Sequence, residues 1–472
     1  MTQYQKYVRA PGNIVMVGFG AIGQGVLPLI LRHIVIDPHD IVIVTSDERG
    51  ADIAKEYGIK MIVRPLTAQN YRDVLAPLMR TGTFLVNLSV DVSSLALMEM
   101  CQESAALYID TCIEPWLGGY TDNSLSASER SNYALRNKTL QLREKYPNAH
   151  TAVICQGANP GMVSHFVKQA LMNLQRDILH TDSEPTSREA WAALAQKLAI
   201  KTIHIAERDT QISSKPKRVG EFINTWSCDG FVSEGAQPAE LGWGTHEQHF
   251  PHDGIRHQFG NGCGIILRRP GAATRVRSWA PHEGHYQGWL ITHNEALSIP
   301  DYLTVWQNGK AIYRPSCHYS YHPCDNAVLS LHELNGRNFH MQTSQRVMCD
   351  DIVAGHDELG VMLAGHAKNA YWFGSQLDIE TARKLAPHNS ATSLQVTSAV
   401  LTGIIWAMEN PRAGIVESDD MDYKRNIEIQ SQYLGKLHGV YTDWNPLHQR
   451  EELFDEDLDR NDPWQFKNVR VV

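Results

Sequence analysis

The sequence predicts an α/β protein built on a doubly wound parallel sheet, together with a second α+β domain. A glycine-rich turn separates a buried strand from a helix near the N-terminus, and further apolar strands alternate with helix-length segments up to about residue 155. This alternation is typical of a parallel sheet with helices on both faces. A chain of 472 residues is also too long for one ordinary core, so we expect at least two domains.

The glycine-rich turn lies in the segment 13–25, which reads NIVMVGFGAIGQG. Gly18 allows the tight turn, Gly20 lets a pyrophosphate approach the backbone, and Gly23 lets the helix pack closely on the strand. The helix N-terminus offers N–H groups and the positive end of its dipole to phosphates. The segment therefore predicts a Rossmann-type dinucleotide site formed by Gly18, Gly20, Ala21, Ile22 and Gly23.

A second β-branched strand, Ile41–Thr45, is followed by Ser46, Asp47 and Glu48. An acid at this place accepts a hydrogen bond from the ribose 2′-hydroxyl and excludes a 2′-phosphate, so the pattern favours NAD over NADP. Asp47 is the predicted ribose ligand because it lies nearer the strand end. Thr45 and Ser46 are alternative partners for the ribose.

Further strands are predicted at 60–63, 83–89, 107–110 and 151–155, with a helix over 92–103. Ligands of such sheets bind beyond the carboxyl ends of the strands. We therefore expect Ser89 to contact the cofactor, and Asp91, Glu114 and Asn159 to lie at the same edge.

Two of these residues carry chemistry that their position suggests. Glu114 lies between a strand end and Pro115, where burial would raise its pKa toward neutrality and let it accept a proton from a bound substrate. Asn159 lies in the strand-to-helix turn Gly157–Gly161. Its amide can contact the substrate or the nicotinamide amide of the cofactor, or the Asn-Pro turn only starts the next helix, and the residues leave both alternatives open.

The rest of the chain divides by pattern. The polar segment 118–146 predicts a surface loop followed by a helix. Short strands rich in Gly, Pro, His and Trp begin at about Thr202. Apolar residues recur at helical spacing from Leu394 to Met408, and Pro411 ends that predicted helix. We predict a nucleotide-binding domain at 1–160, a substrate-binding domain at 161–390, and C-terminal helices that return to the first domain at 391–472.

Composition excludes several classes of protein. The net charge of −9 without a basic block argues against nucleic acid, and no apolar run approaches the ~20 residues of a membrane span, so we expect a cytoplasmic protein that needs no membrane. Eight cysteines without C-x-x-C indicate reduced thiols. Cys317, His318, His322 and Cys324 cluster, but not at the spacing of a zinc site, so we predict a packed loop and no metal.

Four further motifs join the glycine-rich start: CIEPW at 112–116, GANPG at 157–161, NTWSCDG at 224–230 and THNE at 292–295. Together they resemble the bacterial homospermidine synthases, whose architecture is similar to that of saccharopine dehydrogenases. The resemblance implies an NAD-binding Rossmann domain, interrupted by a substrate and dimerisation domain and completed by C-terminal helices. It also implies that two putrescines form homospermidine and ammonia, with NAD reduced and reoxidised in one cycle.

The resemblance implies roles for the site residues. Trp226 would hold an ammonium or iminium by cation–π attraction, although without the resemblance such a Trp is more often core packing. Glu207 and Glu234 would bind the remote ammonium, with Asp91 and Glu114 nearer the nicotinamide; from the residues alone, Glu207 is a surface carboxylate. His293 and Glu295 would close the site, with His293 as a proton shuttle near neutral pH. The family also implies a homodimer.

Two alternatives remain open. A saccharopine- or carboxynorspermidine-type dehydrogenase binds carboxylates and should place Arg or Lys at the substrate, whereas the motif positions here are acidic. A non-catalytic NAD-binding regulator would keep the fold without turnover. The concentration of Trp, His and acids at predicted ligand-edge positions argues against the regulator.

Overall fold

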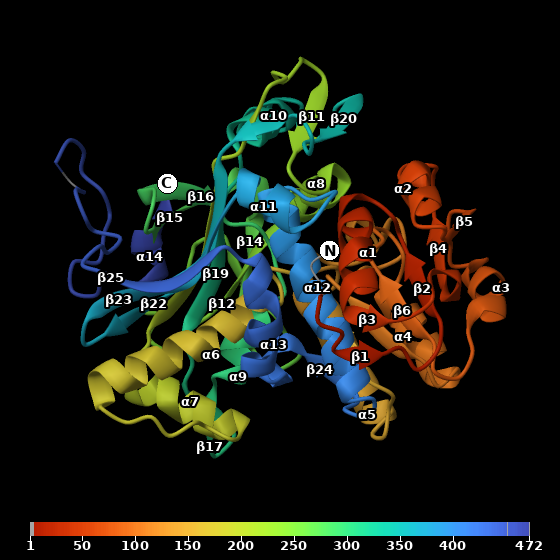
Figure 1. The fold of residues 1–472 in the computed structure, drawn as a ribbon. Helices are drawn as coiled ribbons and strands as arrows, with labels where there is room; N and C mark the ends of the chain where they lie inside the picture. The colour runs from red at the N-terminus through yellow and green to blue at the C-terminus, as the bar shows by residue number, and fades with distance from the viewer. Residues whose placement is uncertain (1–3, 451, 472) are drawn as a thin grey trace.

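The chain forms two large sheets that meet at a long central helix (Figure 1). The computed structural model describes residues 4–450 and 452–471. The first sheet contains seven parallel strands, in the order β24 (Ile415–Glu417), β8 (Ala152–Ile154), β7 (Leu107–Asp110), β6 (Phe84–Asn87), β2 (Ile14–Val17), β4 (Ile41–Thr45) and β5 (Lys60–Val63). All except β24 lie within two residues of predicted strands.

Helices cover both faces of the first sheet, as the sequence predicts. Successive side chains of a strand point to opposite faces, so the apolar strand β2 serves two cores. On one face its side chains join α1 (Ala21–His33) and α12 (Ala391–Glu409), and on the other they join α4 (Ser94–Glu103) and α5 (Asn132–Lys145). The strand order reverses between β2 and β6, which is where such sheets bind their ligand.

The second sheet is mixed and larger. Its main path runs β13 (Gly254–Arg256), β14 (Gly264–Pro270), β12 (Pro238–Gly242), β19 (Ser316–His322), β9 (Thr202–Asp209), β22 (His356–His366), β23 (Asn369–Asp378) and β25 (Lys436–Thr442), and β15 (Arg275–Ala280), β16 (Gly284–Trp289) and β26 (Arg470–Val471) join beside it. The α/β class with a second α+β unit is thus confirmed. The domain boundaries at 160 and 390 stay predictions.

The prediction of a packed loop around Cys317 is wrong for most of that segment. Residues Ser316–His322 form β19, a buried strand that pairs in parallel with β9. Both faces of this strand are covered, because Tyr319 and Tyr321 enter the main core of the second half while the His318 ring lies 4.2 Å from that of His204, between ring centroids. A strand covered on both faces has no polar side to reveal its period.

Shorter elements complete the fold. The remaining helices are α2 (Ala51–Glu56), α3 (Tyr71–Leu75), α6 (Met162–Leu174), α7 (Arg188–Lys197), α8 (Cys228–Ala236), α9 (Glu295–Tyr302), α10 (Asp325–Gly336), α11 (Ile379–Leu385), α13 (Tyr423–Gln430) and α14 (Phe466–Val469). Small strand pairs are β1 (Val8–Arg9) with β3 (Ile34–Val35), β10 (Ile212–Ser213) with β21 (Ile352–Ala354), β11 (Glu221–Asn224) with β20 (Ser344–Val347), and β17 (Val305–Gln307) with β18 (Lys310–Tyr313).

Helix α12 links the two halves, since it packs on α1 and β7 of the first and touches β22 and β23 of the second (Figure 1). Its sequence spacing predicted it correctly. By length and a mean hydropathy of 1.3 it could also cross a membrane, so the expectation that no segment approaches a span does not hold for it. However, 89% of the apolar window is buried inside the fold, as in a core helix.

Candidate active site

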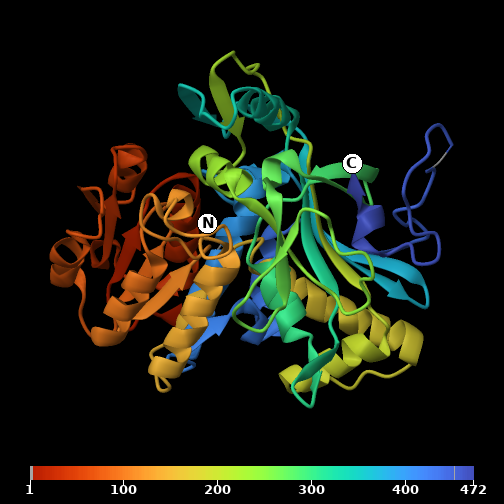
Figure 2. The same cartoon turned by 180° about the vertical axis from the view of Figure 1, so that it is seen from behind.

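A pocket of about 990 Å³ opens between the two halves, at the carboxyl ends of the first sheet. Its walls come from the turns after β2, β4, β6 and β7, and from β9, α8 and β19 of the second half. Helix α8 lies near the nucleotide-binding half in both views (Figures 1 and 2). The volume of the pocket suits a dinucleotide together with a small substrate, since pockets for small ligands reach about 1,000 Å³.

The glycine turn forms one end of the pocket. Gly18 has φ +89°, and a Cβ there would lie 2.6 Å from the Leu88 carbonyl oxygen. Among the described residues, none apart from the chain neighbours of Gly20 has an atom within 4 Å of a Cβ built there, so its backbone is open on that side. Helix α1 starts at Ala21 without a side-chain cap. This cradle fits a pyrophosphate. Gly23 does not line the pocket; it packs against the Gly18 carbonyl instead.

Asp47 lines the same end of the pocket, where its carboxylate forms an ion pair with the Arg49 side chain. The guanidinium donates to both carboxylate oxygens, at 3.0 and 2.7 Å, and these hydrogen bonds lower the pKa of Asp47 to about 2. The carboxylate is therefore ionised and available to a ribose hydroxyl. Arg49 also lines the pocket, and the sequence did not single it out.

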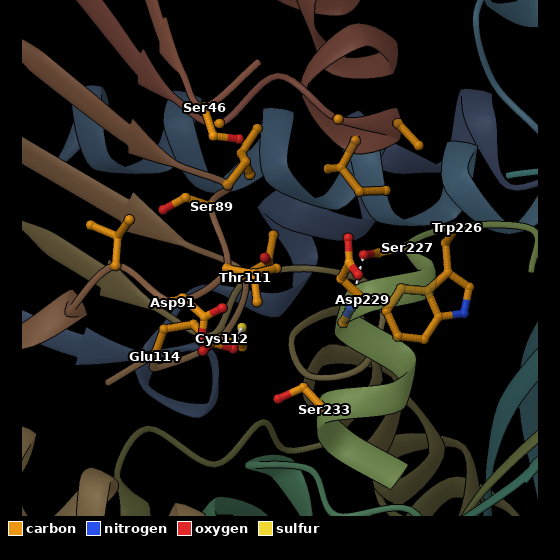
Figure 3. A pocket seen from close by; sticks show the side chains of 18 of the residues that line it. Ser46, Ser89, Asp91, Thr111, Cys112, Glu114, Trp226, Ser227, Asp229 and Ser233 are labelled. Atoms are coloured by element: carbon orange, nitrogen blue, oxygen red, sulfur yellow. Dashed lines mark hydrogen bonds between the residues drawn. The ribbon is translucent and has the colours of Figure 1, made fainter. Parts of the chain in front are cut away.

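Asp91, Cys112 and Glu114 gather on one side of the pocket, opposite Trp226 and the first turn of α8 (Figure 3). Glu114 is 5% exposed, and its Oε1 accepts a hydrogen bond from the Cys112 thiol at 3.3 Å. In the described part of the chain its Oε2 has no hydrogen-bond partner. Burial, reinforced by the charges of Glu234 and Asp91, raises the pKa of Glu114 to about 8. Burial also raises the pKa of Asp91.

Glu207 is buried in β9 and 2% exposed, so its interpretation as a surface carboxylate is wrong. Its Oε2 accepts hydrogen bonds from Asn159 Nδ2 at 2.9 Å and from Tyr319 Oη at 2.6 Å. Burial raises the pKa of Glu207 to about 7. Asn159 thus does more than start a helix, because its amide holds a pocket carboxylate. Tyr319 was not predicted, since the sequence assigned its segment to a loop.

His293 lies between two carboxylates. Its Nε2 is 3.0 Å from Glu234 Oε2, and its Nδ1 is 3.2 Å from Glu295 Oε1. Burial lowers the pKa of His293, but the Glu295 and Glu234 charges outweigh it and raise the pKa to about 10. The imidazole is therefore a cation at neutral pH, which argues against the predicted shuttle. Glu295 lies behind His293 and does not line the pocket.

Trp226 stands on the opposite wall, one residue before the Ser227 cap of α8 (Figure 3). Its indole N–H donates to Tyr321 Oη at 3.2 Å, and its ring lies 5.6 Å from that of Phe231, between centroids. The side chain is partly exposed, toward the pocket that it lines. Carboxylates and an aromatic face thus share one chamber beside a nucleotide cradle.

Comparison with known proteins agrees with this geometry. The family model for the saccharopine dehydrogenase NADP binding domain matches residues 14–154, and that for the saccharopine dehydrogenase C-terminal domain matches residues 157–442. A homospermidine synthase from Blastochloris viridis is 55% identical over 100% of both chains. One from Mesorhizobium japonicum is 52% identical over 98% of this chain and 97% of its own. The chain belongs to the homospermidine synthase family.

A solved structure supports the same placement. The homospermidine synthase of Legionella pneumophila, in complex with NAD, superposes with a TM-score of 0.92 at 44% identity and covers 99% of each chain. The motif resemblance to homospermidine synthases is therefore confirmed, as is the similarity to saccharopine dehydrogenases. The first family model names NADP, whereas the Legionella enzyme was solved with NAD.

Proposed function

We propose that this protein is an NAD-dependent homospermidine synthase, which joins two putrescines into homospermidine and releases ammonia. The observation that carries the proposal is the chamber where buried carboxylates and an indole face adjoin a dinucleotide cradle. Putrescine is a dication at neutral pH, so its site needs negative charge and an aromatic face. The membership of the homospermidine synthase family supports the same substrate.

The charge distribution argues against a dehydrogenase for carboxylate substrates, although the matched family models carry the saccharopine dehydrogenase name. Among the described residues that line the pocket, the arginines are Arg49 and Arg64, and both follow strands of the nucleotide-binding half. The second half contributes the carboxyl groups of Glu207, Glu234 and Asp229, and its His293 cation is held between the carboxylates of Glu234 and Glu295. A carboxylate substrate would meet repulsion there.

The residues of the first half would hold the cofactor. The backbone around Gly18 and Gly20 would bind the pyrophosphate. Asp47 would accept a hydrogen bond from the ribose hydroxyl, and this contact favours NAD over NADP. When bound, NAD supplies a hydride acceptor for the amine carbon and later a hydride donor to the condensed imine, so the overall reaction has no net oxidation.

The other residues act on the amines. The buried Oε2 of Glu114 has no hydrogen-bond partner among the described residues, and the pKa of this carboxyl is about 8, so Glu114 suits the proton that leaves the amine as an imine forms. Glu207, held by Asn159 and Tyr319, would bind the remote ammonium. Trp226 would face the charge that persists from ammonium to iminium. The His293 cation would fix Glu234 in place rather than move a proton.

The test is product formation by the intact enzyme with putrescine and an NAD concentration far below that of the substrate. We expect homospermidine and ammonia in equal amounts, well beyond the NAD supplied, and no product without NAD. Accumulation of NADH in proportion to product would instead indicate an ordinary amine dehydrogenase. NAD binding without any turnover of putrescine would favour the regulator.

A further inference from the structure

Strand β19 places two tyrosines beneath the substrate chamber. Tyr319 and Tyr321 are two residues apart and therefore share one face of the strand. They are 3% and 0% exposed, and their rings stack with centroids 5.3 Å apart at an interplanar angle of 14°. The Tyr319 ring also stacks on His293 at 4.5 Å. The strand thus supports His293, which lines the chamber, through the ring of Tyr319.

Tyr321 contacts Trp226 through Nε1, the single polar atom of the Trp226 side chain. The indole N–H is a donor only, and it donates to Tyr321 Oη at 3.2 Å. The ring of Phe231 lies against the indole, and a Cβ at Gly230 would lie 3.2 Å from Cζ3 of Trp226. Packing therefore limits the position of the Trp226 ring. The hydrogen bond to Tyr321 limits the χ1 and χ2 rotation of that ring, and so the direction that its face takes.

We propose that Tyr321 is a positioning residue, whose hydroxyl orients the Trp226 indole so that its π face meets the substrate cation. The proposal rests on the proposed function for the identity of that cation. Cation–π attraction acts over the ring face, whereas the ring edge carries the opposite partial charge, so a rotated indole loses the attraction. Tyr321 does not line the pocket and acts only through Trp226.

The surroundings keep Tyr321 a neutral acceptor. It is fully buried beside carboxyl groups, and burial together with the charges of Glu207, Asp209 and Asp357 raises its pKa. The phenol ring is packed in the main core of the second half, with Phe231 also 5.3 Å from it between centroids. Loss of the hydroxyl alone would leave this packing intact.

The first experiment is a double-mutant cycle in the full-length enzyme with NAD, using Tyr321→Phe and Trp226→Phe singly and together. Because phenylalanine at 226 has no N–H, the hydroxyl of Tyr321 should matter only when the indole is present. We expect Tyr321→Phe to lower kcat/KM for putrescine about three- to tenfold, as one hydrogen bond implies. In the Trp226→Phe background, its effect should stay within about twofold.

The change should fall mainly on KM, because ammonium and iminium carry the same charge and the indole holds both. The dissociation constant of NAD should not change. Tyr433→Phe is the matched control, because its buried hydroxyl hydrogen-bonds the His33 ring nitrogen at 2.7 Å outside the pocket. A purely structural loss would lower the active fraction, and hence kcat, in both tyrosine variants.

A second measurement does not depend on turnover. The near-UV circular dichroism of Trp226 is isolated as the difference between a protein and its Trp226→Phe variant, measured with and without Tyr321→Phe. We expect the Trp226 difference band to weaken or shift when the hydroxyl is removed. If wild type makes no homospermidine, the proposed function fails while this spectrum still tests the hydrogen bond. An unchanged band, or equal loss of kcat/KM in both backgrounds, would overturn the role of Tyr321.

Discussion

The His293 imidazole is held as a cation by carboxylates on both ring nitrogens, which changes the chemistry that this residue can perform. An imidazolium whose pKa is about 10 stays protonated near neutral pH, so it cannot readily release and take up a proton as a shuttle must. The same charge holds Glu234 at the pocket wall. Proton acceptance then falls to Glu114, whose pKa of about 8 lies nearer neutrality.

The state of His293 predicts a pH dependence of stability. Its pKa rises from 6.5 to about 10 on folding, so the imidazolium stabilises the fold fully below pH 6.5, and this contribution is lost as the pH rises through 10. The Tm of the wild type should therefore fall more steeply than that of His293→Gln between about pH 7 and about pH 10. The exposed His285→Gln should follow wild type. Parallel curves for wild type and His293→Gln would contradict the cation.

Glu114→Gln should remove the acidic limb near pH 8 from the profile of kcat/KM against pH, because the free-enzyme profile reports the groups that must be deprotonated. We expect the plateau to fall about 10²–10⁴-fold, as for loss of a general base. Glu103→Gln, on an exposed ion pair with Arg72, should retain both the limb and the rate. Retention of the limb in Glu114→Gln would assign it to another group.

Trp226 predicts a graded series of variants. Trp226→Phe keeps a weaker aromatic face and much of the volume, so it should retain more kcat/KM for putrescine than Trp226→Ala, which should lose about five- to thirtyfold for a desolvated cation–π contact. Trp226→Glu supplies a full charge without the ring, and should be poor because shape and orientation also matter. NAD affinity is the control. Unchanged turnover in Trp226→Ala would make this residue a packing residue.

At the scale of elements, every strand of the first sheet except β24 could be predicted, because each is a short, mainly apolar run between turn signals. β19 could not, since Cys, His and Tyr form its buried faces and Pro315 and Pro323 flank it. β24 could not either, because three residues carry too little pattern and their partner β8 lies more than two hundred positions earlier. The turn of Gly18 was predictable because its constraint is local.

The two glycines of the β2–α1 turn should fail in different ways. Gly18→Ala strains a positive φ and drives Cβ into the Leu88 carbonyl, so it should lower both the Tm and NAD affinity. The methyl group of Gly20→Ala has no described residue other than its chain neighbours within 4 Å, so the Tm without NAD should stay near wild type. NAD affinity should nevertheless fall about tenfold or more, since the methyl occupies the space of the pyrophosphate. Equal NAD affinity in Gly20→Ala and wild type would contradict the cradle.

At the scale of the whole molecule, the site exists only where the two halves meet. Glu207, Asn159 and Tyr319 form one hydrogen-bonded group, yet they come from separate parts of the chain. Sequence position alone cannot bring them together, which is why Tyr319 was missed and why the residues alone made Glu207 a surface acid. Glu207 lies outside the quoted motifs and was supplied by the family resemblance as a whole, which carries information about the assembled pocket.

A homodimer stays a prediction that rests on the family resemblance and on the prevalence of twofold assemblies. Light scattering at micromolar concentration should give twice the mass of the chain. The mass of a single chain, independent of dilution, would contradict it. The cytoplasmic location likewise stays a prediction, which fractionation of the producing cells would test.

The central claim is that the hydride removed from one putrescine returns to the condensed imine within the same active site. It is tested most directly with putrescine deuterated at both carbons that bear nitrogen, in the presence of NAD and an excess of unlabelled NADH, followed by mass spectrometry of the product. The account predicts homospermidine that retains every deuterium of both substrates. Homospermidine that has lost one deuterium per molecule would show that the reducing hydride came from the free cofactor pool, and would contradict the account.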